Sequence, residues 1–181
     1  MGALALTPAP LPPVMLAEVK AYLRIATGEE DALLAGHVRS AAEACEAFTG
    51  RVLIERAIAE TLPASPAWTR LGAAPVRAIE SVAALEADWS ERALAASDYA
   101  IDIDAAGEGW VRLLGRIEEK RIRVRYAAGL AADPNGIPEP LRHGVLRLAA
   151  HLYGQRDSGR PAEPPAAVTA LWRPWRRLRL G

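Results

Sequence analysis

The sequence contains very little of what covalent and metal-based chemistry requires. Cys45 is the only cysteine among 181 residues, and there are three histidines. A single cysteine excludes an intramolecular disulfide and a zinc site built on cysteines, and it suits a reducing compartment. We expect Cys45 to fill a small apolar position in the core.

Long apolar runs and a leader sequence are missing as well. No apolar stretch is long enough to span a bilayer. The first residues have no basic region and are interrupted by Pro8, Pro10, Pro12 and Pro13, which argues against a signal peptide, and Leu6 breaks the myristoylation pattern. We therefore expect a soluble protein that is made in the cytoplasm and has no membrane partner.

Charge is balanced overall but unevenly distributed. The chain has 22 basic and 22 acidic residues. Four of the arginines and two of the five tryptophans lie in the last ten residues, 172–181, which contain no acid. The rest of the chain is therefore mildly acidic and carries a basic, aromatic tail. Tails that are too short to form a core usually find their partner elsewhere.

Three segments have the apolar spacing of amphipathic helices, namely residues 14–26, 30–49 and 138–157. Their apolar positions recur at steps of three and four: Leu16, Val19 and Leu23; Leu34, Val38, Ala41, Cys45 and Phe48; Leu141, Val145, Leu148 and Leu152. Gly50 is a suitable C-terminal stop for the second helix.

Between residues 51 and 126 the apolar period changes to two. Val52, Ile54, Ile58 and Leu62 fall on one parity and predict a long strand. Shorter strands are predicted at 68–71, 79–85, 99–103, 110–113 and 121–126. Short strands separated by turn residues indicate antiparallel hairpins. The predicted fold class is therefore α+β, with a helical core of three main helices, an inserted antiparallel β-rich unit and an extended C-terminal tail.

The predicted domain organisation follows from these elements. Residues 1–159 form one domain that includes the β-rich insertion at 51–126. Residues 160–181 form an appendage, with a proline-rich linker at 160–165, a short helix at 166–172 and the basic tail. Pro174 ends the short helix.

Catalytic and metal-binding residues are scarce. His143 and His151 lie eight residues apart on one predicted helix, about 12 Å along its axis, which is too far to share a metal. His37 has no liganding partner nearby in sequence. We interpret all three as surface or packing residues, and we predict no catalytic residue, metal or cofactor.

The best carboxylate cluster consists of Asp98, Asp102, Asp104 and Glu108. It lacks the calcium-loop spacing and its glycine, so we interpret it as a solvated strand face. Gly107-Glu108-Gly109 lacks the third glycine of a phosphate-binding loop and does not open a helix.

Arg121, Arg123 and Arg125 project from one side of the same predicted strand. They could form a surface for nucleic acid. We favour an exposed face that is paired with the acids of the carboxylate cluster.

The tail is the strongest candidate site. A basic C-terminus frayed in solvent would explain its arginines but not its tryptophans, which are costly to leave in water and are typical interface anchors. We place both tryptophans outside the core and interpret the tail as a partner-binding segment. The predicted partner-binding residues are Trp172, Arg173, Pro174, Trp175, Arg176, Arg177, Leu178, Arg179 and Leu180.

The order of these features resembles the phage head-to-tail connector, or adaptor, family. The resemblance runs through most of the chain and rests on these segments: LAEVKAYLRI (16–25), EDALL (30–34), AAEACEAFTGR (41–51), PVRAIESV (75–82), VRYAAG (124–129), IPEPL (137–141), LAAHLY (148–153) and AVTALWRPWR (167–176). Each segment alone is weak, whereas their order and spacing are specific for the family.

The resemblance implies a structural protein without catalysis. Its subunits would form a twelvefold ring that docks on the portal protein through the tail and presents its far side to a stopper or other neck or tail protein. DNA would pass through the ring without sequence-specific binding. The resemblance also implies a location at the head-to-tail interface of a phage or a phage-like particle such as a gene transfer agent, after synthesis in the bacterial cytoplasm.

Two alternatives remain open. Within the structural class, the chain could be another neck component, such as a stopper or tail-completion protein. From another class, it could be a small DNA-binding protein that uses Arg173, Arg176, Arg177 and Arg179 on phosphates, and four such contacts would give a salt slope of about 3.6. The acidic remainder and the missing recognition-helix motif weigh against this second alternative.

Overall fold

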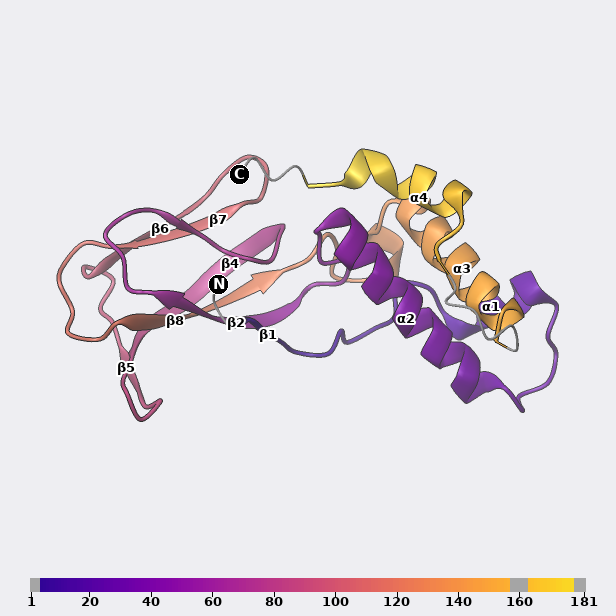
Figure 1. The fold of residues 1–181 in the computed structure, drawn as a ribbon, viewed down its shortest axis with the longest axis horizontal. Helices are drawn as coiled ribbons and strands as arrows, with labels where there is room; N and C mark the ends of the chain where they lie inside the picture. Colours follow the sequence, from indigo (N-terminus) through magenta and orange to yellow (C-terminus); the bar gives the residue numbers. More distant parts are fainter. Residues whose placement is uncertain (1–3, 157–162, 178–181) are drawn as a thin grey trace. The chain divides into compact units, whose positions relative to one another are not determined.

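The computed structural model describes residues 4–156 and 163–177, and the chain divides into two compact units. One unit, residues 1–9 with 55–130, is built from strands, and the other, residues 10–54 with 131–181, is built from helices (Figure 1). The predicted α+β fold, in which an antiparallel β-rich segment is inserted between helices, is confirmed.

The helical unit contains four α-helices: α1 (Leu16–Leu23), α2 (Asp31–Thr49), α3 (Glu139–Gly154) and α4 (Ala166–Trp172). Two short 3-10 helices, η1 (Pro134–Gly136) and η2 (Arg173–Trp175), accompany them. The three main helices and the short helix at 166–172 were all predicted. α1 is shorter than expected because Arg24 adopts a left-handed backbone with φ 59°, which ends the helix. In the described part of the chain, no helix is long and apolar enough to cross a membrane.

The core of the helical unit lies between α2 and α3, and both α1 and α4 pack on α3. The apolar positions that predicted these helices are buried at Val19, Leu34, Val38, Ala41, Leu141, Val145 and Leu148. Cys45 is also fully buried, as predicted, and burial raises the pKa of its thiol to about 12. The spacing of apolar residues therefore identified the inner faces of the long helices.

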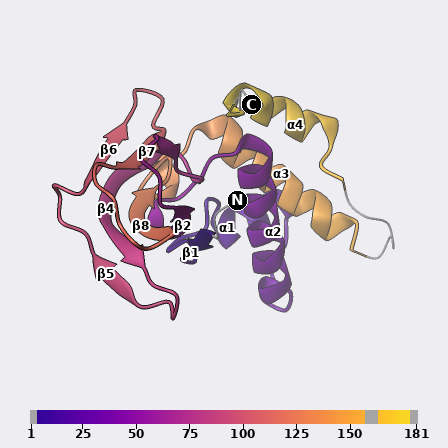
Figure 2. The same ribbon diagram turned by 60° about the vertical axis from the view of Figure 1, so that its left-hand side comes forward.

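The β unit contains two antiparallel sheets (Figure 1 and Figure 2). The five-stranded sheet has the order β1 (Leu4–Leu6), β2 (Arg56–Pro63), β8 (Arg121–Ala128), β4 (Val76–Leu85), β5 (Glu91–Ala93). The three-stranded sheet has the order β3 (Thr69–Arg70), β7 (Gly109–Leu113), β6 (Tyr99–Ile103). Strand β8 is therefore paired on both sides, whereas β6 lies at the edge of its sheet.

Most strands lie close to where the alternation predicted them. Strand β2 begins at Arg56, because Val52 and Ile54 belong to the helical unit, where both are buried. Strands β1 and β5 were not predicted. Both have only three residues, so an alternation of apolar and polar residues cannot be recognised in them. Each is held by pairing with a longer strand.

A buried carboxylate anchors the interior of the β unit. Glu60 lies on the inward parity of β2, and its Oε2 accepts hydrogen bonds from the Tyr126 hydroxyl at 2.8 Å and from the Gly72 amide at 2.8 Å. A β-carbon at Gly72 would lie 2.9 Å from Glu60 Oε1, so a larger residue there would have to displace the Glu60 carboxylate. Burial, and secondarily the Glu60 charge, raises the pKa of Tyr126, which keeps its hydroxyl protonated as a donor.

Candidate functional site

The first tryptophan of the predicted partner-binding segment is part of the core. Trp172 is 0% exposed, its ring centroid lies 5.8 Å from that of Phe48 in α2, and its Nε1 donates to the Leu141 carbonyl at 3.4 Å. The indole lies against Gly144 of α3, where an added β-carbon would be 2.0 Å from Nε1. The expectation that both tryptophans lie outside the core is therefore wrong for Trp172, because α3 leaves room for an indole at a glycine.

The chain after Trp172 is held against the C-terminal end of α2. Arg51 Nε donates to the Trp175 carbonyl at 2.9 Å, and the Arg177 amide donates to the Thr49 carbonyl at 2.7 Å. The Arg176 guanidinium lies over the Phe48 ring, 5.3 Å from its centroid. As far as Arg177, therefore, the predicted tail is a folded part of the helical unit.

Side chains that remain accessible on this segment are mainly basic. Arg173, Pro174 and Arg176 are exposed, and Trp175 and Arg177 are half-buried. Within residues 4–156 and 163–177, neither Arg173 nor Arg176 has an ion-pair partner. We call Arg173, Trp175 and Arg176 the C-terminal basic surface. Leu178, Arg179 and Leu180 lie outside the described residues.

Two of the three arginines of β8 share one acid, and the third lies on an aromatic ring. Arg125 and Arg123 pair with Glu91 of β5 at 2.6 and 3.5 Å, and the Arg121 guanidinium lies 4.5 Å from the centroid of the Trp89 ring. The Arg125 hydrogen bond holds the pKa of Glu91 below its usual range. Pairing with acids was predicted, but the partner is Glu91 and not the predicted carboxylate cluster, because β4 pairs with both β8 and β5.

Two members of the carboxylate cluster, Asp98 and Asp104, accept hydrogen bonds from nearby backbone amides. Asp104 Oδ1 accepts hydrogen bonds from the amides of Ala106 and Glu108 at 2.9 Å each, which forms the turn between β6 and β7. Asp98 Oδ2 accepts one from the Ala95 amide at 3.1 Å. In the described part of the chain, no group of three or more His, Cys, Asp or Glu side chains is placed to hold a metal ion.

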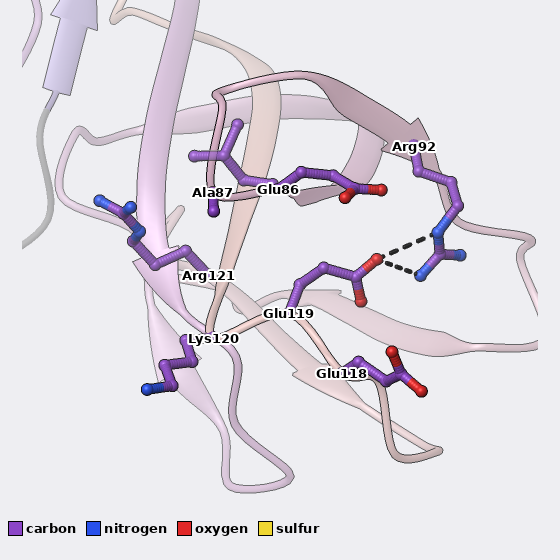
Figure 3. A pocket seen from close by; sticks show the side chains of 8 residues that line it. Glu86, Ala87, Arg92, Glu118, Glu119, Lys120 and Arg121 are labelled. Carbon is purple, nitrogen blue, oxygen red and sulfur yellow. Dashed lines mark hydrogen bonds and ion pairs between the residues drawn. The ribbon is translucent and has the colours of Figure 1, made fainter.

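One open pocket of about 840 Å³ lies in the β unit, beside the turn between β4 and β5 (Figure 3). Its charged lining is mixed, with Arg92 bound to Glu119 at 2.6 Å. The Arg92 hydrogen bond lowers the pKa of Glu119, which therefore stays ionised. Besides Arg92 and Glu119, the lining residues are Leu85, Glu86, Ala87, Glu118, Lys120 and Arg121. This lining contains no histidine, cysteine or serine, so it offers no pair of nucleophile and histidine base.

Of the three histidines, His37 has an aromatic packing contact. His37 of α2 packs edge-on against Tyr153 of α3, with ring centroids 6.4 Å apart. Burial, and secondarily the Arg156 charge, lowers the pKa of His37, which favours the neutral ring. This contact matches the packing role that we predicted for it.

Comparison with known proteins identifies the class. A model of the phage gp6-like head-tail connector protein family matches residues 13–163, which is most of the chain. The chain therefore belongs to the head-tail connector family, and the resemblance seen in the sequence is confirmed. Among curated protein sequences, none matches the chain.

Three chains in solved structures are similar to this chain over nearly its full length. The chain is similar to one in the neck of an empty GTA particle, computed with C6 symmetry, with 28% identity and a TM-score of 0.78 over 98% of this chain and 97% of that one. It is similar to a chain in the neck of a native GTA particle, computed with C12 symmetry, with 27% identity and a TM-score of 0.78 over 99% and 97%. It is also similar to a chain in the virion of a native gene transfer agent (GTA) particle, with 29% identity and a TM-score of 0.77 over 98% and 96%.

Proposed function

We propose that this connector is the adaptor subunit of the neck of a phage-like particle, and that twelve copies close a ring between the portal and the next neck component. The observation that carries the proposal is the full-length likeness to chains of GTA necks, which includes both units and not only the helices. A ring of identical subunits needs one patch that meets a different patch on its neighbour, with a rotation that closes. DNA would pass through the centre of the ring without base-specific contacts.

We further propose that the ring docks on the portal through the C-terminal basic surface. Arg173 and Arg176 offer guanidinium forks to carboxylates, and Trp175 adds a half-buried aromatic face beside them. Trp172 contributes differently from the prediction, because its buried indole fixes the segment to α3 and so holds the basic surface in place. Leu178, Arg179 and Leu180 remain predicted members of the same portal contact.

The direct test measures binding of the full chain to the portal of the same particle. Alanine at both Arg173 and Arg176 should weaken binding by roughly thirtyfold for each arginine, a typical loss for an interface anchor. Arg39→Ala is the matched control, because Arg39 is an exposed arginine of α2 that lies outside the surface. Lysine at both positions keeps the charge but loses the guanidinium fork. The affinity of this double lysine variant for the portal should therefore lie between that of the natural chain and that of the double alanine variant.

The copy number and the DNA alternative are tested on the same material. Mass measurement of the portal complex should give one copy of this chain for each portal subunit, and one or a few copies for the whole particle would reject the ring. A DNA-binding role would instead appear as binding to duplex DNA that falls steeply with salt and is lost in the double alanine variant. If the double alanine variant binds the portal with the affinity of the natural chain, the C-terminal basic surface is not the portal contact.

A further inference from the structure

Strand β6 is the longest edge strand in the described part of the β unit. It pairs with β7 alone, from Tyr99 opposite Leu113 to Ile103 opposite Gly109, with no break in register. The other edge strands, β1, β3 and β5, have two or three residues. Edge strands invite pairing with another chain unless they are short, bulged or protected by lysine or proline, and β6 has none of these features.

The register shows which backbone groups of β6 face outward. The Leu114 amide donates to the Asp98 carbonyl at 2.9 Å, and the Asp104 amide donates to the Glu108 carbonyl at 3.0 Å. Hydrogen-bonded pairs alternate along an antiparallel ladder, so the even-numbered residues of β6 bond to β7. The amides and carbonyls of Tyr99, Ile101 and Ile103 therefore point away from β7, and the part of the chain that the structure describes places no strand there.

Side chains along this edge are apolar and acidic. Ile101 is 44% exposed and Ile103 is 39% exposed, although both are isoleucines at alternate positions of a strand. Asp102 between them is exposed and has no ion-pair partner among the described residues. Asp102 is the one charged residue of β6, and Arg112 of β7, opposite Ala100, lies over the Trp68 ring. The edge is therefore suited to a strand that is both apolar and basic.

We propose that the β6 edge binds an extended segment of another neck protein as an added antiparallel or parallel strand. The segment would have apolar residues at every second position, which would cover Ile101 and Ile103, and lysine or arginine between them, close to Asp102. Main-chain hydrogen bonds to Tyr99, Ile101 and Ile103 supply affinity in this mode, and the alternating side chains supply specificity. This proposal depends on the proposed function in one respect, because the proposed function is the reason for placing the partner in the neck.

Segments of this chain are weaker candidates for the occupant. Strand β8 alternates arginine with apolar residues, but it is already paired with β2 and β4. The sequence at 177–180, RLRL, alternates in the same way, and the proposed function assigns Leu178, Arg179 and Leu180 to the portal. A chain that ends at Arg177 therefore serves as a control for pairing with a second copy.

The test uses the full-length protein and a synthetic peptide, acetyl-KVRVRVK-amide, with binding followed by isothermal titration calorimetry. Ile101→Pro removes the outward amide of Ile101 without removing a hydrogen bond to β7, because proline is tolerated where the amide faces solvent. It should weaken binding by at least about tenfold, the equivalent of one hydrogen bond. Ile101→Thr keeps the amide and the β-branched shape, so it should bind within a few-fold of the natural chain.

The charge of the edge is tested separately. Asp102→Asn should lower the affinity and reduce its dependence on salt, whereas Glu80→Gln, a change at an exposed acid of β4, should do neither. The peptide acetyl-EVEVEVE-amide should not bind. Equal binding of both peptides, or unchanged binding by Ile101→Pro, would overturn the proposal.

Two further outcomes identify the occupant. The full chain could self-associate, and both Ile101→Pro and a chain that ends at Arg177 could abolish that association. This result would show that a second copy covers the β6 edge, and it would overturn the proposal of another neck protein. In assembled particles, Ile101→Pro should keep the portal contact and lose one other neck protein. Conversely, the Arg173 and Arg176 double variant should lose the portal but still bind the peptide, so the two proposals can fail independently.

Discussion

Replacing Trp172 with alanine should destabilise the helical unit itself. The side chain is fully buried between Gly144, Leu141 and Phe48, and its removal leaves a cavity that α3 and α4 can only partly fill. Truncation of a buried tryptophan costs about 3–5 kcal/mol of unfolding free energy. Urea unfolding followed by circular dichroism at the helical band measures this loss.

Trp175→Ala is the matched control, because it removes the second tryptophan of the same segment. Trp175 is half-buried, and its backbone carbonyl would still accept from Arg51, so the cost should be about 1 kcal/mol or less. Deleting residues 172–181 should accordingly unfold part of the unit, whereas a chain that ends at Arg177 should remain folded. The sequence analysis placed both tryptophans outside the core, and that placement would have left the chain folded after the longer deletion.

A second substitution tests the packing directly. Gly144→Ala places a methyl group where the indole lies, and overpacking of this kind costs about 1–3 kcal/mol. Trp172→Phe, with its smaller ring, should recover part of that loss when combined with Gly144→Ala, because the two positions share one space. Additive effects in the double variant, or a Trp172→Ala variant within about 0.5 kcal/mol of the natural chain, would refute the core placement.

Three other predictions concern buried and paired groups. Tyr126→Phe should cost about 1–3 kcal/mol, because it leaves the buried Glu60 carboxylate with one donor fewer, and urea unfolding measures this. Cys45 should resist iodoacetamide at pH 8 in the folded chain. Since the pKa of its thiol is raised to about 12, stability should fall as the pH rises from 9, where the unfolded thiol ionises, toward 12. Glu91, whose pKa is lowered by Arg125, should stabilise the sheet above its ordinary pKa, and this contribution should be lost as the pH falls through the lowered value. Glu91→Gln should remove that part of the acid dependence of unfolding.

Periodicity in the sequence was sufficient for the elements whose faces are buried along their whole length. The steps of three and four in α2 and α3, and the alternation in β8, each repeat over enough residues to identify helix or strand and its inner face. The family was also recognisable from the order of its sequence segments, and the family model matches the chain from residue 13 to residue 163. Short strands such as β1 and β5 carry no such repeat, so only pairing with a longer strand defines them.

The candidate sites depended on contacts between distant residues, which a linear pattern does not contain. Composition marked the C-terminal segment as basic and aromatic, but only the space left by Gly144 on α3 assigned Trp172 to the core and left Arg173 and Arg176 outside it. The partner of the β8 arginines followed from the order of strands β8, β4 and β5, and the free edge of β6 followed from the order β3, β7, β6. Local sequence fixes the period of a segment, whereas neighbours brought together by folding decide which of its faces remain open to a partner.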